Sequence, residues 1–341
     1  MADGATTARR RALAPVHRAP AWPRWLFAAL SPAGARARLS ILIFHRVREV
    51  RDPLFPSAIT APDFRERMQW LRDWFNVLPL LDAVRALQRG TLPARAASIT
   101  FDDGFADNAE VALPILRDLG LHATFFVAAG FLDGGRMWNT TLVEAVRAAR
   151  GDELDLGDLG LGRHAIASIP ARRAAIAALL PALKHLPPDE RQAKVDAVAQ
   201  RVGGALPADL MMTSAQVREL SAAGMGIGGH TVSHPILAAL DASSAMREIA
   251  EGRETLRAIV RQDVPLFAYP NGQPGGDYRA AHVGMVRDAG FEAAVSTAHG
   301  AARQGASLFE LPRFTPWAGG PAKWAGLFAR NLRTPIRCAP S

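Results

Sequence analysis

The stretch Ser98–Gly104, with the sequence Ser-Ile-Thr-Phe-Asp-Asp-Gly, constrains the fold of this chain more than any other. A run with strand propensity ends here in two carboxylates and a glycine. Successive strand residues point to opposite faces, so Asp102 and Asp103 can serve one reaction centre only where the chain leaves the strand, and Gly104 permits that turn. One carboxylate can then hold a metal while the other acts as a base. The alternative is an ordinary Asp-Asp-Gly turn.

A second polar stretch, Gly228–Pro235, also follows a short apolar run. Its two histidines, His230 and His234, are four positions apart and can share a metal. Zinc proteases of the His-Glu-x-x-His type need Glu after the first His, where this chain has Thr231, so a protease is not indicated. Pro235 disfavours a helical His234, which places the pair on a loop. One Asp and two His leave coordination positions open, as catalytic metals require, although either His taken alone could be a surface or capped residue.

Together these motifs resemble the polysaccharide deacetylases that share the NodB homology domain, also called carbohydrate esterase family 4. The resemblance covers roughly Leu39 to Trp317. Thr100–Gly104 matches the first motif of the family, His230–Pro235 the second, and Phe267–Gly272 the third. The first two motifs are specific and occur in the family's order.

The resemblance implies hydrolytic N-deacetylation of an N-acetylated amino sugar in a glycan. It makes Asp102 the general base, and Asp103, His230 and His234 the ligands of a divalent metal. Zn²⁺ is the expected metal, with Co²⁺ or Ni²⁺ as alternatives. The third motif departs from compact members, which have Arg at its start and an aromatic residue at position 271. A backbone N–H at Asn271 is its candidate oxyanion donor, with Tyr269 as a further candidate contact for the substrate.

The general acid does not stand where many members have it, because the late Leu-x-x-x-x-His motif is not visible. His282 and His299 lie in the right half of the chain but in poor context. In the branch that resembles biofilm poly-N-acetylglucosamine deacetylases the acid is a His after the first strand, and His45 matches it; a structural role for His45 is the alternative. Arg313 is expected to orient Asp102 or bind substrate, unless it forms a surface salt bridge.

Strand and helix patterns alternate through much of the chain, which predicts an α/β fold with a parallel sheet. Leu39–Phe44 reads as a buried strand, and Thr60 can cap a helix that has Pro62 in its first turn. Thr213 and Gln216 form a second capping box. Strands are expected at about 266–269 and 292–296, with helices at 243–260 and 278–289. The family implies a distorted, incomplete (β/α) barrel of about seven strands, with the site at the carboxyl ends of the strands.

A helical insertion is expected between the two metal motifs. The 127 positions that separate Asp103 from His230 are more than compact members need. From about 138 to 212 the pattern is helical, without regular strand signals, as in exopolysaccharide-associated members. Trp138 at its start can offer a face for sugar stacking or be a buried core residue. The expected organisation is a basic N-terminal segment (1–38), a deacetylase domain (39–320) and a basic amphipathic tail (321–341).

The net charge of +8 belongs to the two ends of the chain. Residues 1–40 hold seven Arg and one Asp, and residues 321–341 hold four basic residues and no acid. The body is therefore slightly acidic, which does not favour nucleic-acid binding. The ends could lie on an anionic membrane through Trp22, Trp25, Leu26 and Phe27, and through the face of Trp324 and Phe328, or dock on the domain.

The sequence shows no good signal peptide and no run of 18 apolar residues, and Cys338 is its only cysteine, so no intramolecular disulfide can form. A cytoplasmic or peripheral inner-membrane location is favoured. The expected function is N-deacetylation in exopolysaccharide modification. The alternatives are a deformylase or deacetylase of a lipid-linked amino sugar, a glycan-binding relic without activity, and a non-haem iron oxygenase.

Overall fold

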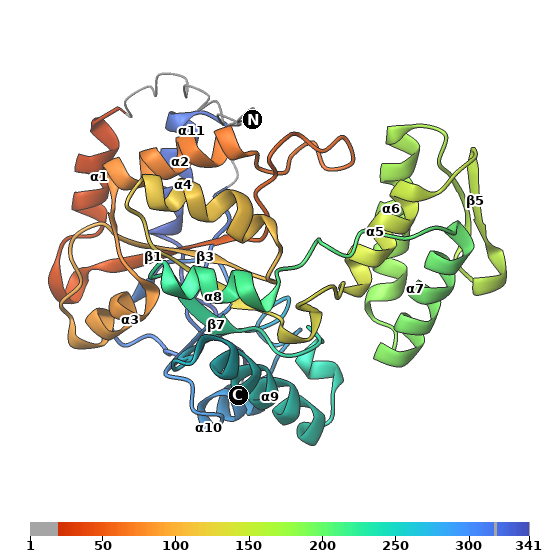
Figure 1. Cartoon of the computed structure of the whole chain (residues 1–341). Coiled ribbons are helices and arrows are strands. Elements are labelled where there is room, and N and C mark those ends of the chain that lie inside the picture. The colour runs from red at the N-terminus through yellow and green to blue at the C-terminus, as the bar shows by residue number, and fades with distance from the viewer. Residues whose placement is uncertain (1–19, 317–318, 341) are drawn as a thin grey trace, which may run out of the picture.

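The computed structural model describes residues 20–316 and 319–340. The first nineteen residues of the expected N-terminal segment, Trp317 and Ser341 therefore lie outside the described residues. The main body is a curled sheet wrapped by helices (Figure 1). Its strands are β1 (Arg38–Phe44), β2 (Asn76–Val77), β3 (Ala96–Phe101), β4 (Ala123–Val127), β7 (Gly226–Gly229), β8 (Leu266–Ala268), β9 (Ala293–Val295) and β10 (Ala302–Arg303).

The strand order is β10-β1-β3-β4-β7-β8-β9, with β2 paired to β3 off this path. All neighbours from β1 to β9 are parallel, and β10 is antiparallel to β1. The segment 311–314 lies between the two outer parallel strands, with single bridges from Leu311 to Val295 and from Phe314 to Leu42. The sheet is therefore a distorted, incomplete barrel, and the expected fold class is confirmed.

The strands form because their side chains are apolar on both faces, as parallel strands covered by helices require. All six residues of β3 are buried, and Phe101 stacks between Phe44 and Phe125 on the face of the sheet that Phe64 of a neighbouring helix covers. The helices around the sheet are α1 (Trp22–Leu30), α2 (Ala61–Trp74), α3 (Leu80–Arg89), α4 (Leu113–Asp118), α8 (Ser214–Ala222), α9 (Ala242–Val260), α10 (Ala280–Asp288) and α11 (Pro321–Asn331).

Two helix starts confirm the expected capping. Thr60 caps α2 in a capping box with Asp63, with Pro62 in the first turn. Thr213 caps α8 in a box with Gln216. Each box supplies partners for backbone N–H groups that the first helical turn leaves unpaired. The local sequence thus determines where these helices begin.

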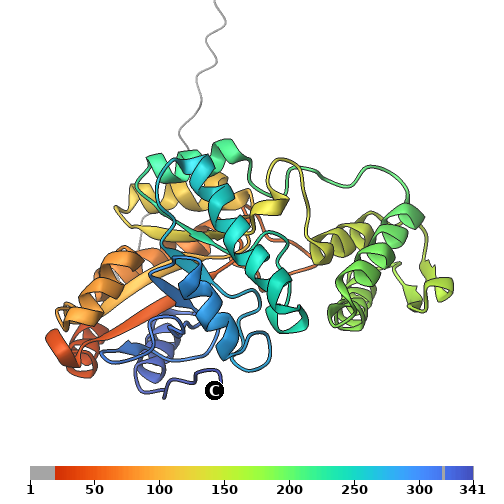
Figure 2. The ribbon, with the colours of Figure 1, turned by 90° about the horizontal axis from the view of Figure 1, so that it is seen from below.

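The region between β4 and α8 forms a separate lobe beside the barrel (Figures 1 and 2). Its apolar residues form their own cluster, which includes Leu142, Leu179 and Val195. Besides the expected helices the region contains an antiparallel hairpin, which the sequence pattern did not predict. The lobe consists of α5 (Trp138–Ala148), β5 (Glu153–Leu156), β6 (Gly162–Ala165), α6 (Ile169–Lys184) and α7 (Pro188–Val202).

The loop between β1 and α2 ties this lobe to the barrel. Asp52 accepts two hydrogen bonds from the Arg147 guanidinium of α5, at 3.1 and 2.8 Å, and lies 3.4 Å from Arg48. Leu54 belongs to the apolar cluster of the lobe. The loop that begins at His45 is therefore held by both parts of the molecule.

The described ends of the chain pack on each other and on α2. Phe27 of α1 and Phe328 of α11 are in ring contact, and both are fully buried, as is Trp324. These side chains therefore cannot face a membrane. Trp22 and Trp25 remain 51% and 80% exposed, so the expected membrane contact now rests on them and stays a prediction.

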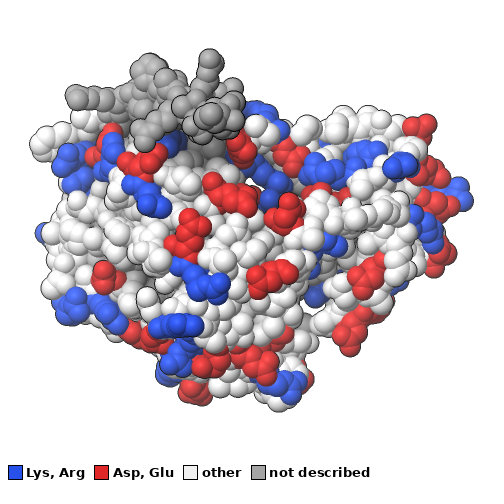
Figure 3. All heavy atoms as spheres, in the orientation of Figure 1, with Lys and Arg blue, Asp and Glu red and all other residues white. Residues whose placement is uncertain are grey.

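None of the described helices combines the length and the apolar character needed to cross a bilayer. Figure 3 shows acidic and basic side chains interspersed over the visible face of the barrel and the lobe. The excess of positive charge expected at the two ends of the chain does not extend over this face.

Candidate active site

The first motif lies where β3 ends. The N–H of Asp102 donates to the carbonyl of Phe44 at 2.9 Å, which continues the ladder of β1 and β3 by one residue. The chain then turns, with φ of 78° at Asp103 and 89° at Gly104. A Cβ at Gly104 would lie 3.0 Å from Val127 Cγ1, so both the backbone angle and the packing favour glycine. The turn directs two adjacent carboxylates toward the same opening.

Asp102 is held by a buried arginine. Its two carboxylate oxygens accept hydrogen bonds from Nη1 and Nη2 of Arg313, each at 2.7 Å. Arg313 also donates to Thr100 Oγ1 and to the carbonyl of Ser296, and its side chain has no exposed surface. Burial alone would raise the pKa of Asp102, but the charges of Arg313 and His230 and the hydrogen bonds from Arg313 hold it below its ordinary value. Asp102 is therefore a fixed, ionised carboxylate, and Arg313 makes the contact that orients it.

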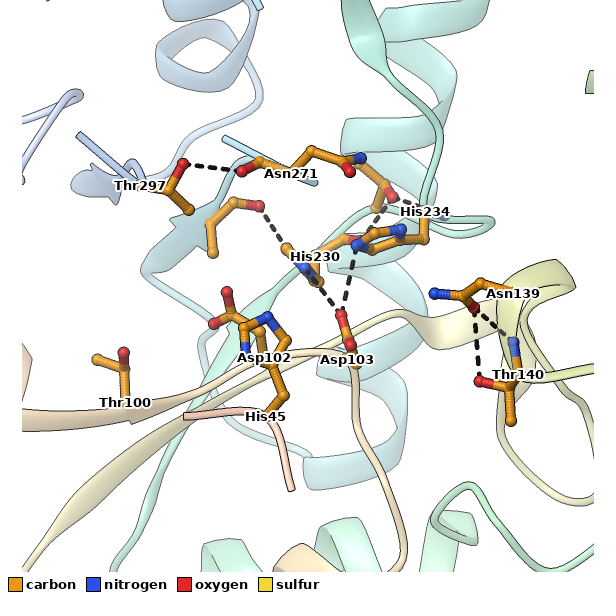
Figure 4. Close-up of polar contacts among 12 residues, drawn as sticks. His45, Thr100, Asp102, Asp103, Asn139, Thr140, His230, His234, Asn271 and Thr297 are labelled. Atoms are coloured by element: carbon orange, nitrogen blue, oxygen red, sulfur yellow. Dashed lines mark hydrogen bonds and ion pairs between the residues drawn. The ribbon is translucent and has the colours of Figure 1, made fainter. Parts of the chain in front are cut away.

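Asp103 faces the two histidines (Figure 4). Its Oδ1 lies 3.5 Å from Nε2 of His230 and 3.3 Å from Nε2 of His234. The three ligand atoms lie within 4.8 Å of one another, and two of the three residues, Asp103 and His230, are buried. Asp102 does not belong to this cluster. The two neighbouring aspartates thus have separate environments.

The ring orientation of His230 and the ionised state of Asp103 suit a metal site. Nδ1 of His230 lies 2.7 Å from the carbonyl of Ala268, which leaves Nε2 directed at Asp103. Burial would raise the pKa of Asp103, but the hydrogen bond to His230 and the charges of the histidines lower it well below its ordinary value. Burial lowers the pKa of His234 to about 4, whereas Asp103 and Asp102 outweigh burial and raise that of His230.

The histidine loop depends on a residue that the sequence did not reveal. Glu248 of α9 accepts hydrogen bonds from the N–H groups of Val232 and Ser233, both at 2.8 Å, and from Ser233 Oγ at 2.6 Å. Thr231 and His234 have φ of 65° and 54°, which side-chain-bearing residues seldom adopt. Glu248 therefore stabilises a strained loop. It lies fourteen positions after His234, and no local motif marks it.

His45 follows β1, as expected, and in Figure 4 its ring lies beside Asp102 and Asp103. Its carbonyl accepts a hydrogen bond from Asn108 Nδ2, which a π-helical turn (Asn108–Ala112) presents. The exposed His45 side chain lines a mainly apolar hollow of about 550 Å³ between the barrel and the lobe. His282 instead accepts a hydrogen bond from the Arg279 N–H at the start of α10, and neither it nor His299 lines this hollow.

The third motif brings only part of its residues to the site. Asn271 has φ of 58° and lines a second hollow, of about 290 Å³, together with His234. The side chain of Tyr269 does not reach the site, contrary to expectation. It is 1% exposed, stacks on Tyr278 and donates its hydroxyl hydrogen to the carbonyl of Phe309. Tyr269 is a core residue because its ring fills space between the sheet and the loop before α10.

Trp138 lies at the start of α5 and lines the same 290 Å³ hollow as His234 and Asn271. The guanidinium of Arg191 lies over its indole, 5.0 Å from the ring centroid. One face of the indole is therefore already in contact with the protein. Trp138 borders the site, but only part of its surface is open to a ligand.

The family model for polysaccharide deacetylases matches residues 89–157 and 190–294. The Bacillus subtilis (strain 168) protein YxkH, which bears the polysaccharide deacetylase name, is 20% identical over 299 residues, covering 87% of this chain and 78% of YxkH. The gap in the match, 158–189, falls within the lobe.

Three solved structures share the fold. The Streptococcus pyogenes deacetylase PplD, in complex with acetate, aligns at a TM-score of 0.59 with 19% identity, over 87% of this chain and 98% of PplD. IcaB from Ammonifex degensii aligns at 0.55 with 18% identity, over 89% and 99% of the two chains. A de-N-acetylase from Aggregatibacter actinomycetemcomitans aligns at 0.55 with 16% identity, over 84% and 99%.

The family match spans the Asp102–Asp103 and His230–His234 motifs, and the structure brings those motifs together at the carboxyl ends of β3 and β7. Sequence, fold and clustering of polar groups therefore agree. The chain belongs to the polysaccharide deacetylase family and is a hydrolase of the deacetylase type.

Proposed function

We propose that this protein removes the N-acetyl group of an amino sugar in a glycan by metal-dependent hydrolysis. The observation that carries this proposal is that two adjacent aspartates have different contacts. Asp103 lies in a cluster of three potential metal ligands, whereas Asp102 is fixed beside it by Arg313 and remains available as a base. The names of two similar structures, a deacetylase in complex with acetate and a de-N-acetylase, support the same reaction.

The cluster fits a divalent metal by its donor set. Two imidazole nitrogens and one carboxylate oxygen converge within 4.8 Å, which is the three-ligand set typical of catalytic zinc. The bond from His230 to Ala268 fixes the ring orientation, as is usual for metal-bound histidines. Asp103, His230 and His234 are the proposed ligands, and Zn²⁺ is the proposed metal, with Co²⁺ or Ni²⁺ as alternatives. When bound, such a metal supplies Lewis-acid polarisation of a carbonyl and a lowered pKa for a water.

The remaining steps use side chains and backbone of the chain itself. Asp102 accepts the proton of the attacking water, and Arg313 keeps its carboxylate in place for that transfer. His45 donates a proton to the leaving amine. The N–H of Asn271 has no hydrogen-bond partner within the described residues, so it is open to the oxyanion, a contact worth roughly 3 kcal/mol. The products are a free amino sugar and acetate.

Acetate release from N-acetylglucosamine oligomers tests the proposal. The full chain is assayed as purified, after chelation, and after Zn²⁺ or Co²⁺ is restored. We expect release that chelation abolishes and metal restores. Asp102→Asn should bind metal in a one-to-one ratio but release acetate about 10²- to 10⁴-fold more slowly. Normal turnover by metal-loaded Asp102→Asn would refute the role of Asp102, and chelator-insensitive release would refute metal dependence.

A further inference from the structure

The 290 Å³ hollow beside His234 and Asn271 is lined by basic side chains. It is bordered on the lobe side by the end of α6 and by α7, which place Lys184, His185 and Arg191 on its wall. A third hollow, of about 190 Å³, shares these three residues and adds Arg279. No acidic residue lines either hollow. The approach to His234 is therefore basic, although the body of the chain is slightly acidic.

Arg191 is the least satisfied of these cations. The residue is only 8% exposed, and burial lowers the pKa of its guanidinium. Its Nη1 donates to the carbonyl of Lys184 at 3.3 Å, and its indole contact with Trp138 covers one face. Its Nε is buried and has no hydrogen-bond partner. Within the described residues, neither Arg191 nor Lys184 makes a salt bridge with a carboxylate.

A buried guanidinium without a carboxylate is costly unless a ligand supplies the anion. Planar guanidinium groups bind carboxylate and phosphate oxygens through paired, charge-assisted hydrogen bonds, and a lysine beside them adds a mobile charge. A wall with one sign of charge also attracts oppositely charged ligands into the hollow. A neutral sugar would offer Arg191 and Lys184 no anion with which to form charge-assisted hydrogen bonds.

We propose that this hollow is a subsite for an anionic group of the glycan, a carboxylate or a phosphate carried next to the acylated amino sugar. Arg191 and Lys184 bind the anion, and Trp138 holds the guanidinium of Arg191 in place. The position beside His234 and Asn271 makes the anion part of the same bound substrate. The inference rests on the proposed deacetylation, because it concerns the substrate of that site.

The test compares binding and turnover of matched oligosaccharides. Three N-acetylated oligosaccharides of equal length are used: a neutral one, one with a uronate next to the acylated residue, and one with a phosphate there. Binding to metal-loaded Asp102→Asn is measured by titration calorimetry, and kcat/KM is measured with the wild type. We expect at least one of the charged oligosaccharides to bind about tenfold more tightly than the neutral one, and the stronger of the two identifies the anion.

Two variants probe the subsite itself. Lys184→Gln and the conservative Arg191→Lys should each reduce the ratio of charged to neutral kcat/KM about tenfold, mainly through KM. Arg173→Gln removes the same charge from an exposed position of α6 that lines neither hollow and should leave the ratio as in the wild type. Because the readout is a ratio of two substrates on one protein, a partly unfolded variant does not imitate the effect.

The outcomes separate this inference from the proposed function. Equal use of neutral and charged oligosaccharides, or a preference that both variants retain, overturns the anionic subsite and leaves deacetylation intact. A folded, metal-loaded protein that neither binds nor deacetylates any of the three overturns the proposed function and the subsite together.

Discussion

The two halves of the candidate site are anchored in opposite ways. The carboxylate turn after β3 is held from inside the barrel by Arg313, which has no exposed surface. The histidine loop after β7 is held from outside by Glu248, whose partner Ser233 is exposed. Loss of Arg313 leaves the charge of Asp102 buried without a partner, whereas water can replace the contacts that Glu248 makes. We therefore expect that loss of Arg313 lowers both activity and stability, whereas loss of Glu248 lowers mainly the affinity for the proposed metal.

Removal of Arg313 should have the largest effect. Arg313→Met leaves the buried Asp102 without its cation, so that its carboxylate is either unpaired or takes up a proton, and we expect a cost of about 3–5 kcal/mol of unfolding free energy. Deacetylation should fall by about 10²-fold or more, because Asp102 loses its orientation. Urea unfolding and acetate release measure the two effects. Arg85→Met breaks a paired contact at the surface, with Glu292, and should cost far less stability, because solvent screens this exposed pair. Equal losses in the two variants would contradict the contrast.

Gly252→Ala tests how closely α9 packs on the histidine loop. A Cβ at this position would lie 2.8 Å from both the carbonyl carbon and the oxygen of Thr231. The loop must shift, and we expect a loss of about 1–3 kcal/mol in stability together with weaker metal binding. Gly284→Ala in α10 is the matched control, because nothing lies within 4 Å of its added Cβ. That variant should be neutral or stabilised by about 0.5–1 kcal/mol. If Gly252→Ala behaved like Gly284→Ala, the contact would not hold the loop.

Glu248→Ala removes the carboxylate that accepts hydrogen bonds from the histidine loop, and it changes no proposed ligand. Three hydrogen bonds are lost, so His230 and His234 should be less well oriented. We expect metal affinity to fall about 10- to 100-fold, with little change in urea unfolding of the metal-free protein. Competition with a chromogenic chelator measures the affinity. Glu251→Ala, an exposed change on the same helix, is the control. An unchanged affinity in Glu248→Ala would show that the strained loop is stable alone.

The sequence predicted best where the chemistry is local. Asp102 and His230 each directly follow a strand, Asp103 and His234 come within four residues of them, and parallel strands bring such ends to one edge. Contacts between distant segments were harder to predict. Whether Arg313 orients Asp102 or lies at the surface stayed open, because 211 positions separate them and only the return of segment 311–314 to β1 joins them. The β5–β6 hairpin was missed because each strand is only four residues long and, although β5 alternates between polar and apolar residues, β6 does not.

The smallest effect is expected for Asp52, in the loop that begins at His45. Like Asp102 it is a buried carboxylate held by an arginine, but, as for Glu248, its partner is partly open to solvent. Its side chain is 8% exposed, like the carboxylate turn, but its partner Arg147 is 34% exposed. Burial would raise the pKa of Asp52, but hydrogen bonds from Arg147 and Leu54 lower it below its ordinary value. Its stabilising effect is therefore complete above the ordinary pKa of an aspartate and is lost as the pH falls through the lower pKa of the folded state.

Asp52→Asn should therefore cost about 1 kcal/mol of unfolding free energy at pH 7, a figure that allows for the solvent around Arg147. The difference from the wild type should shrink as the pH falls below about 4. Urea unfolding at pH 7 and at pH 3 to 4 measures it, with the exposed Asp209→Asn as the control. A difference that did not depend on pH would mean that Asp52 acts through its shape rather than its charge. A loss of deacetylation larger than the loss of stability would instead show that the loop positions His45, because Asp52 itself contacts no residue of the metal cluster.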